Sequence, residues 1–398
     1  MNNSYPLIDC PSDPCGYYKG QLYKAVQKVH ESHKILTLDW LTLSLTACLE
    51  APKQGEYNPV QLGNDIVIVP QLHGWKRFTY SWDVYYHGEK VALLGSHPRK
   101  EIGVIKADFC SLQLLNHVLQ TDLLWEFLLD LFDLEGVSLH NVQEVHIAMD
   151  GCSGLTDLVN KVLFRGAAKE QIRKVGRNSA TNLDPVGFNS RLQQAAGFYV
   201  GSRKSDRFIR IYDKSKELEV SNKLYFKDLW AKNGIDQEEP VERFEMVLRS
   251  KELRKIKDFD LWKLADTKYL ASLLKTGCKN LFEFAWVDES DSNTRRWERV
   301  EIFDWENIGG KALTKLPKTQ STTDHYKAKL SIHLAFKCLM IDTTCENQAS
   351  RDMQYASDLA DRYGLRTWMN KKIDFWRSEY RPIGQLYNQG FDPMVLKF

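Results

Sequence analysis

The sequence GFYVGSRKSDRFIRIYDKSKE, residues 197–217, reads as two strands joined by a polar turn. Aromatic and β-branched residues fill both flanks, whereas the central GSRKSD segment holds residues that favour a turn. Successive side chains of a strand point to opposite faces, so Ile209 and Ile211 share one face. Arg210 and Tyr212 then share the other face of the same strand. We predict an antiparallel hairpin that presents Tyr212 beside Arg210.

Strand patterns recur on both sides of this hairpin. Alternation and β-branched enrichment predict further strands at residues 34–47, 65–69, 78–87, 90–94, 101–109, 144–150 and 241–249. Gly88 favours a tight turn between two of them, because glycine reaches positive φ at little cost. Helical spacing of apolar residues predicts helices at 112–134, 156–163, 261–274, 324–338 and 352–362. The predicted fold class is α+β: a mostly antiparallel central sheet flanked by helices, with a helical C-terminal region.

Composition is that of a globular chain. Of its 398 residues, 43% are hydrophobic, and no apolar run approaches the roughly 18 residues that a membrane span needs. The N-terminus lacks the pattern of a signal peptide, so we expect no membrane partner and a cytoplasmic location. The eight cysteines form no C-x-x-C pair and are expected to be reduced thiols. A net charge of +2 does not by itself indicate a nucleic-acid binder.

Charge is instead concentrated next to the hairpin tyrosine. Residues 202–216 contain six basic residues against two acidic ones: Arg203, Lys204, Arg207, Arg210, Lys214 and Lys216 against Asp206 and Asp213. Fixed cations favour a phenolate over a phenol, and they also stabilise the charge that develops in phosphoryl transfer. A tyrosine nucleophile needs such surroundings. The alternative interpretation is an ordinary tyrosine at a strand end with solvated neighbours.

Four segments together resemble one family. The segment GSRKSDRFIRIYDKSKE closely resembles the signature of the replication initiation factor family, the relaxase-like initiators of plasmids, filamentous phages and integrative elements. Three further segments match in the family's order: ILTLDWLTL, EVHIAMD ending at Asp150, and VERFEMVLR. The resemblance covers roughly residues 35–250. It implies a catalytic nicking domain at 34–250, preceded by an N-terminal segment at 1–33. The mainly helical region at 251–398 lies outside the resemblance, and we expect it to bind DNA or mediate oligomerisation.

The resemblance also implies roles for individual residues. Tyr212 corresponds to the family's nucleophile, with Arg210 and Lys214 as its cationic neighbours. The basic residues of the turn, Arg203, Lys204 and Arg207, become candidates for DNA binding. The family uses a divalent metal, so we expect Mg²⁺ or Mn²⁺ held by carboxylates that face the tyrosine.

Strand alternation selects two carboxylates for this metal, Asp150 as the first ligand and Glu245 as the second. The alternative for each is a cross-strand ion pair, for example Glu245 with Arg210. Asp39 is a weaker candidate because its strand is apolar on both faces. The chain departs from its relatives where they commonly carry two more acids, since His146 and Gly151 appear to occupy those places. His146 could replace a carboxylate as neutral imidazole, although a satisfied polar residue is the favoured interpretation.

The expected activity is that of a rolling-circle replication initiator. It would nick one origin strand, leaving a 5′-phosphotyrosine and a free 3′-OH primer. The expected partners are origin DNA, double-stranded with the nicked strand locally unpaired, a DNA polymerase and a second copy in a homodimer. No Walker motif is present, so a host helicase is a further expected partner. The ten histidines include no His-hydrophobe-His triplet, so the common two-histidine nickase motif is missing.

Two other functions remain open at this point. The same nick could serve as the relaxase step of conjugative DNA transfer. Alternatively, the protein could be a non-catalytic origin-binding regulator that has lost its metal site. Additional DNA contacts are predicted at the basic clusters 97–100 and 254–257 and at the aromatic, basic stretch 365–381. An amphipathic helix that packs its aromatic side chains inward would explain the last stretch equally.

Overall fold

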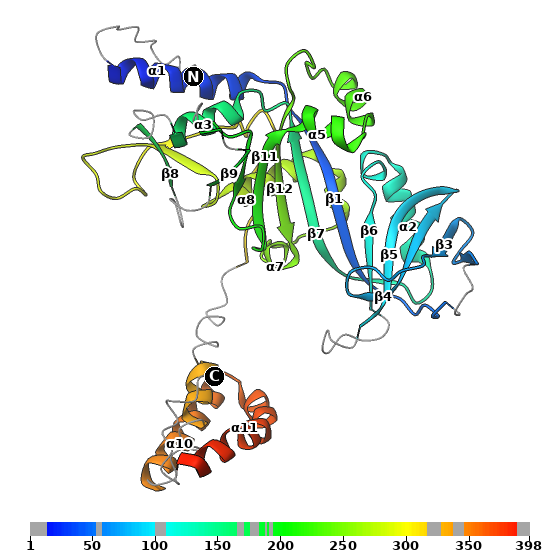
Figure 1. The fold of residues 1–398 in the computed structure, drawn as a ribbon, viewed down its shortest axis with the longest axis vertical. Helices are drawn as coiled ribbons and strands as arrows, with labels where there is room; N and C mark the ends of the chain where they lie inside the picture. The colour runs from blue at the N-terminus through cyan, green and yellow to red at the C-terminus, as the bar shows by residue number, and fades with distance from the viewer. Residues whose placement is uncertain are drawn as a thin grey trace. The chain divides into compact units, whose positions relative to one another are not determined.

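The computed structural model describes most of the chain in two compact units, Met1–Lys315 and Leu316–Phe398 (Figure 1). The described residues are 14–52, 58–99, 109–164, 171–175, 183–187, 189–190, 194–316, 328–336 and 346–387. The first unit holds the hairpin and every strand described below.

An eleven-stranded antiparallel sheet forms the centre of the first unit. Its strands, in spatial order, are β2 (Val60–Gln61), β3 (Ile66–Pro70), β4 (Phe78–Tyr86), β5 (Glu89–Pro98), β6 (Phe109–Leu114), β1 (Ile35–Thr46), β7 (Ser138–Asp150), β12 (Glu242–Arg249), β11 (Arg207–Asp213), β10 (Gly197–Val200) and β9 (Leu183–Val186). A smaller sheet contains β14 (Arg299–Val300), β13 (Glu283–Trp286) and β8 (Ile172–Val175). The predicted α+β class with a mostly antiparallel sheet is confirmed.

Helices accompany the sheet along the first unit. They are α1 (Pro14–Glu31), α2 (Leu123–Asp133), α3 (Leu155–Phe164), α5 (Lys214–Ser221), α6 (Tyr225–Lys232), α7 (Ser250–Leu253) and α8 (Thr267–Cys278), with 3₁₀ turns η2 (Val118–Gln120) and η3 (Trp262–Ala265). The second unit contains a helical segment at 328–336, α10 (Glu346–Arg362) and α11 (Arg366–Tyr387). Its own core includes Ile332, Phe336, Ala360 and Trp376.

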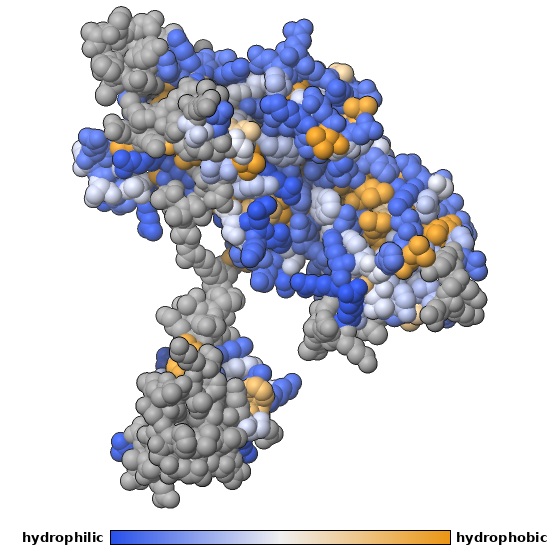
Figure 2. All heavy atoms as spheres, viewed as in Figure 1, coloured by the Kyte–Doolittle hydropathy of each residue, from blue (hydrophilic) through white to orange (hydrophobic). Residues whose placement is uncertain are grey.

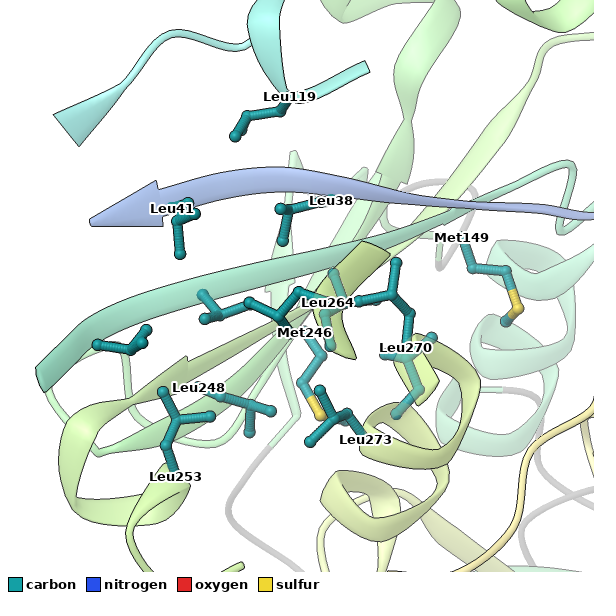
Figure 3. Packing of buried hydrophobic residues seen from close by; sticks show 14 of the residues in the cluster. Leu38, Leu41, Leu119, Met149, Met246, Leu248, Leu253, Leu264, Leu270 and Leu273 are labelled. Carbon is teal, nitrogen blue, oxygen red and sulfur yellow. The ribbon is translucent and has the colours of Figure 1, made fainter. Parts of the chain in front are cut away.

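The two faces of the central sheet carry different side chains. On one face, apolar side chains from β1, β7 and β12 pack with those of η3 and α8, including Leu38, Met149, Met246 and Leu270 (Figure 3). On the other face, α5 and α6 bury a separate group around Phe226 against one end of the strands (Figure 1). Beyond that group, this second face is polar and charged. It holds the site described below.

The structure differs from the predicted elements at two places in the first unit. The helix expected at 112–134 is the end of β6, the turn η2 and the shorter α2, because Leu112 and Leu114 belong to strand β6 and face the core. The helix expected at 261–274 divides into η3 and α8, since Asp266 caps α8 with a hydrogen bond from the Lys268 backbone N–H at 2.8 Å. Most of the strand predicted at 101–109 lies outside the described residues.

The compact unit that contains the sheet continues to Lys315, past the boundary at 250 expected from the sequence. Leu253, Leu273 and Phe303 belong to the same core cluster as the central strands, which explains the continuation. Within the described residues, no helix is both long enough and apolar enough to cross a membrane. Hydrophilic side chains cover most of the visible face of the first unit, and apolar residues show there at several separate places (Figure 2).

Candidate active site

Tyr212 lies where β11 passes directly into α5. The Asp213 side chain accepts a hydrogen bond from the Lys216 backbone N–H at 3.1 Å, and this N-cap begins the helix one residue after the strand. Ile209 and Ile211 belong to the core cluster, so Tyr212 faces the polar side of the sheet. The tyrosine is therefore held at a fixed junction between strand and helix.

Glu245 of β12 is the centre of the polar face. Its side chain is 1% exposed, and its cross-strand neighbours are Arg210 on one side and the small Ala148 on the other. Tyr212 Oη donates a hydrogen bond to Glu245 Oε2 at 3.1 Å, and Arg210 Nη2 lies 3.4 Å from Glu245 Oε1. The structure thus brings together three of the residues selected from the sequence, including the anticipated Arg210–Glu245 ion pair.

The electrostatic surroundings of Tyr212 differ from those expected. Burial and the Glu245 carboxylate raise the pKa of Tyr212 above its ordinary value, and the charge of Arg243 only partly opposes them. Lys214 Nζ lies 6.0 Å from the Tyr212 ring centre, but it is bonded to Glu217, and burial lowers the pKa of Lys214. In this arrangement the nearby cations do not outweigh burial and the Glu245 carboxylate, and the Tyr212 hydroxyl donates its hydrogen bond to Glu245.

Both carboxylate oxygens of Asp150 accept hydrogen bonds from within the protein. Arg243 donates to both of its carboxylate oxygens, from Nε at 2.5 Å and from Nη2 at 2.7 Å. Trp230 of α6 donates a further bond from Nε1 at 2.8 Å. Asp150 and Arg243 are cross-strand partners and are both fully buried. The alternative considered for the predicted ligand Asp150, a cross-strand ion pair, thus accounts for the contacts of both carboxylate oxygens.

Asp39 joins the site through an irregularity in β1. The register with β7 shifts between Leu38 and Trp40, which leaves Asp39 as the extra residue. Such a bulge re-aims side chains, and here both Asp39 and Trp40 contact residues on the polar face. Asp39 Oδ1 accepts a hydrogen bond from Arg243 Nη1 at 2.6 Å, and Trp40 stacks on His146 with ring centres 5.5 Å apart. The apolar pattern of the strand had made Asp39 the weaker candidate.

His146 is held between two carboxylates. Its Nδ1 lies 2.8 Å from Glu245 Oε1, and its Nε2 lies 2.7 Å from Glu144 Oε1. Burial alone would lower the pKa of His146, but these two hydrogen bonds raise it above its usual value. Each ring nitrogen thus lies within hydrogen-bond distance of a carboxylate oxygen.

Gly151 is the second position at which the chain departs from the family pattern, and this departure also has a structural cause. Gly151 follows β7 with a φ of +86°, in the region that favours glycine. A Cβ atom placed there would lie 2.1 Å from the backbone oxygen of His33. An acidic residue at this position would therefore clash, and the site must be assembled from other groups.

Those groups are Asp39, His146 and Glu245. All three are buried, and one potential ligand atom from each lies within 4.8 Å of the others. Two carboxylates and an imidazole form a donor set that suits Mn²⁺ or Mg²⁺, with the imidazole favouring Mn²⁺. Cation binding would require His146 to lose one proton, since a ligating imidazole is neutral. The residues present fit a divalent cation.

The predicted DNA-binding residues of the turn differ in their availability. Arg203 and Lys204 are exposed, and the Arg203 guanidinium lies 4.8 Å from the Tyr199 ring centre. Arg207 is half-buried, and its Nη1 lies 3.5 Å from Oε1 of the buried Glu252. Arg203 and Lys204 can therefore reach a phosphate, whereas Arg207 already has a partner within the protein.

The other basic clusters are also partly engaged. In α11, Trp376 is buried in the core of the second unit, whereas Phe375 is 55% exposed. Arg366 bonds to Asp361, and in the first unit Lys255 bonds to Glu252 at 2.5 Å. Inward packing thus explains part of the aromatic pattern at 365–381, as the alternative interpretation anticipated.

Four further residues of the site were not selected from the sequence: Glu144, Trp40, Trp230 and Arg243. Trp40 follows Asp39 in the family-like triplet Asp39-Trp40-Leu41, and that triplet was the available signal. Glu144 precedes His146 by two residues and faces the same side of β7. Trp230 lies on α6, so its contact with Asp150 depends on tertiary packing that alternation does not report.

The chain can now be compared with known proteins. Residues 141–335 match the family model described as replication initiation factor, and this span includes β7, β11 and β12. Among solved structures, a rolling circle replication initiator protein from Geobacillus stearothermophilus is similar at 16% identity and a TM-score of 0.39, over 70% of this chain and 96% of that one. No curated protein matches. The similarity to the replication initiation factor family thus covers residues 141–335 of the chain.

Proposed function

We propose that the protein starts rolling-circle replication by nicking one origin strand, with Tyr212 as nucleophile and a divalent metal in the site. One observation carries the proposal. The Tyr212 hydroxyl bonds to Glu245, and Glu245 belongs to the buried cluster with Asp39 and His146 that fits a cation. A phenol beside a metal-binding carboxylate is what a phosphodiester transfer requires. The family match supports replication initiation as its setting.

In the proposed reaction, Tyr212 Oη attacks the scissile phosphorus as the bond to the 3′ oxygen breaks. The products are a 5′-phosphotyrosine and a 3′-OH, and the 3′ oxygen takes a proton from solvent. Since the pKa of Tyr212 is raised, the phenol loses its proton only as the new bond forms. Glu245 Oε2, at 3.1 Å, is the acceptor in place. Arg210, partly exposed beside Glu245, can stabilise the transferring phosphoryl group.

The cation would be held by Asp39, His146 and Glu245. When bound, it would polarise a non-bridging oxygen and stabilise the leaving 3′ oxygen. Lys214 is a positioning residue in this scheme, because it packs under the Tyr212 ring and bonds to Glu217. The partners that follow from the reaction are origin DNA with an unpaired nicked strand, a helicase to unwind it and a DNA polymerase to extend the 3′-OH. A homodimer would supply a second tyrosine for closing the displaced strand.

The test incubates purified protein with supercoiled origin DNA and Mn²⁺ or Mg²⁺ and measures nicked circles and protein-linked 5′ ends. Tyr212→Phe should abolish both products while DNA binding persists. Tyr225→Phe is the matched control, because Tyr225 is also half-buried near Asp39 and Arg243, and its hydroxyl has no hydrogen-bond partner among the described residues. Full nicking by Tyr212→Phe would refute the assignment.

Two rival functions have distinct outcomes. A non-catalytic origin-binding regulator would bind the DNA but give no nick with either metal, in wild type or variant. A conjugative relaxase would give the same nick, but the origin would then support plasmid transfer between cells and not autonomous replication. Comparing the two phenotypes for one origin-bearing plasmid separates these roles.

A further inference from the structure

A tight turn presents Trp75 and Lys76 beside the polar face of the sheet. The Phe78 backbone N–H donates to the Trp75 carbonyl at 2.9 Å, and Lys76 has a φ of +53°, which is uncommon for a residue with a side chain. A Cβ atom at Gly74 would lie 2.5 Å from the backbone oxygens of Phe78 and Thr79, so only glycine fits there. Such backbone strain is retained where the side chains must be held in place.

Gly95 makes room for this turn on the sheet. A Cβ atom at Gly95 would lie 2.6 Å from the Phe78 ring and 2.9 Å from the Trp75 ring. The two rings are nearly parallel, with an interplanar angle of 19°. The missing side chain in β5 therefore lets Trp75 lie against the sheet. The position of the Trp75 ring therefore depends on strands β4 and β5 and on the turn that precedes β4.

Lys76 connects Trp75 to a second tryptophan. Lys76 Nζ lies 4.2 Å from the Trp75 ring centre and 6.0 Å from the Trp40 ring centre. Gln113 of β6 accepts a hydrogen bond from the same ammonium at 3.1 Å, and Trp40 Nε1 donates to Thr42 Oγ1 at 2.9 Å. Both anchors come from the sheet, so the spacing of the two rings and the cation is fixed.

This array is continuous with the site around Tyr212. Trp40 stacks on His146, whose Nδ1 bonds to Glu245, the partner of Tyr212. Lys76 is exposed, and both Trp40 and Trp75 keep part of their surface exposed. Trp82 in the neighbouring strand is only 2% exposed, as a tryptophan with a purely structural role would be. The array thus extends the nicking site along the surface, through alternating rings and a cation.

We propose that Trp40, Lys76 and Trp75 form a subsite for single-stranded DNA that seats the unpaired strand next to Tyr212. Bases stack on the two indole rings, and Lys76 neutralises a backbone phosphate between them. The ligand class follows from the chemistry, since flat rings spaced by a cation match unstacked bases joined by phosphates. In a duplex, those base faces are already stacked. The inference rests on the proposed function in one respect, because it takes the strand at the nick as the ligand.

Binding is measured by fluorescence anisotropy with a labelled oligothymidylate, with Tyr212→Phe as the parent so that no cleavage occurs. Trp75→Ala should weaken binding about tenfold. With an abasic oligonucleotide of the same length, its effect should be less than twofold, because only the stacking contact is lost. Lys76→Ala should weaken both ligands about threefold and reduce the slope of log affinity against log salt by about 0.7, the value for one phosphate of a single strand.

The chain offers a matched control. Trp262 and Lys263 form the same dipeptide in η3, where Trp262 is 41% exposed and packs near Trp125 and Phe132 of α2. Trp262→Ala and Lys263→Ala should leave single-strand affinity within twofold. Trp75→Phe is the control for a folding defect at this position. It keeps an aromatic face and should bind within about threefold of the parent.

Four results would overturn the subsite. Trp75→Ala and Trp262→Ala could have equal effects, Trp75→Ala could weaken the abasic ligand as much as the normal one, or duplex affinity could fall as strongly as single-strand affinity. These outcomes are distinguishable from failure of the nicking proposal, since binding is measured without cleavage. Wild-type protein that nicks origin DNA while Trp75→Ala binds normally would refute the subsite alone.

Discussion

Two regions on the polar face of the sheet contain the same kinds of side chain in different arrangements. The Arg243 network comprises Arg243, Asp39, Asp150 and Trp230. The Glu245 cluster comprises Glu245, His146, Tyr212 and Arg210, and Asp39 connects the two regions because it bonds to Arg243 and also belongs to the candidate cation site with His146 and Glu245. In the network, Arg243 is fully buried under α6 and three of its nitrogens bond to carboxylates. In the cluster, the partners are shared, and the Arg210 side chain is 34% exposed.

The difference shows what makes a buried carboxylate structural or reactive. Asp150 has an opposite charge in bidentate contact, so loss of this pairing would leave two buried nitrogens of Arg243 without a carboxylate partner. Glu245 divides its oxygens between His146, Arg210 and a neutral phenol. Burial alone would raise the pKa of Glu245, but the hydrogen bond from His146 and the charge of Arg210 lower it to about 2. Of the two regions, only the cluster contains a phenol, the proposed nucleophile Tyr212, and a partly exposed cation.

Removing the cation of the Arg243 network should have the largest effect on stability. Arg243→Met leaves Asp150 and Asp39 buried without their partner, which should lower the free energy of unfolding by about 3–5 kcal/mol. Arg210→Met is the control in the cluster and should cost under about 1 kcal/mol, because its side chain is partly exposed. Urea unfolding at neutral pH measures both. Equal losses would remove the distinction between the two regions.

Metal addition should stabilise the protein through the cluster. A cation that binds only the folded state, at a concentration of about 100 times its Kd, adds about 2.7 kcal/mol. Glu245→Gln should lose most of that gain, and a chelator should remove it from the wild type. Differential scanning fluorimetry with and without Mn²⁺ measures the shift. Asp150→Asn lowers stability but should keep the Mn²⁺-induced shift, and a lost shift in that variant would contradict the assignment.

Glu252 is a buried carboxylate outside both regions, and its partners are lysine and arginine side chains with a structural role. Burial alone would raise its pKa, but contacts with Lys255, Lys315 and Arg207 lower it to about 2. A lowered pKa contributes stability that is present above the unfolded value of 4.5 and is lost as pH falls toward 2. We expect Glu252→Gln to cost about 1–2 kcal/mol at pH 7 and much less at pH 3. A cost that does not change with pH would rule out this linkage.

The smallest predicted effect concerns Lys204 in the hairpin turn. Lys204 is exposed, so Lys204→Ala should leave stability unchanged and weaken duplex binding only a few-fold. The slope of log affinity against log salt should fall by about 0.9, the value for one duplex phosphate. Titrations at several salt concentrations measure this slope. An unchanged slope would exclude Lys204 from phosphate contact.

Sequence alone predicted much of the sheet and half of the site. Alternation in 206–212 and 241–249 correctly placed Tyr212, Arg210 and Glu245 on one face, because regular strands have a period of two residues. It could not show the bulge that re-aims Asp39, since a bulge breaks that period. Nor could it show that Trp230 and Arg243 donate hydrogen bonds to the Asp150 carboxylate. The Trp230 contact depends on how α6 packs against the sheet.

The most direct test of the account is to identify the residue that becomes linked to DNA. Wild-type protein is incubated with Mn²⁺ and an origin oligonucleotide whose short upstream fragment, which carries the free 3′-OH, dissociates after cleavage and so traps the covalent complex. Tandem mass spectrometry of the digested complex then locates the nucleotide adduct. We predict a single adduct on Tyr212, absent from Tyr212→Phe and strongly reduced in Glu245→Gln. An adduct on Tyr225, or DNA nicked without any protein adduct, would contradict the central claim.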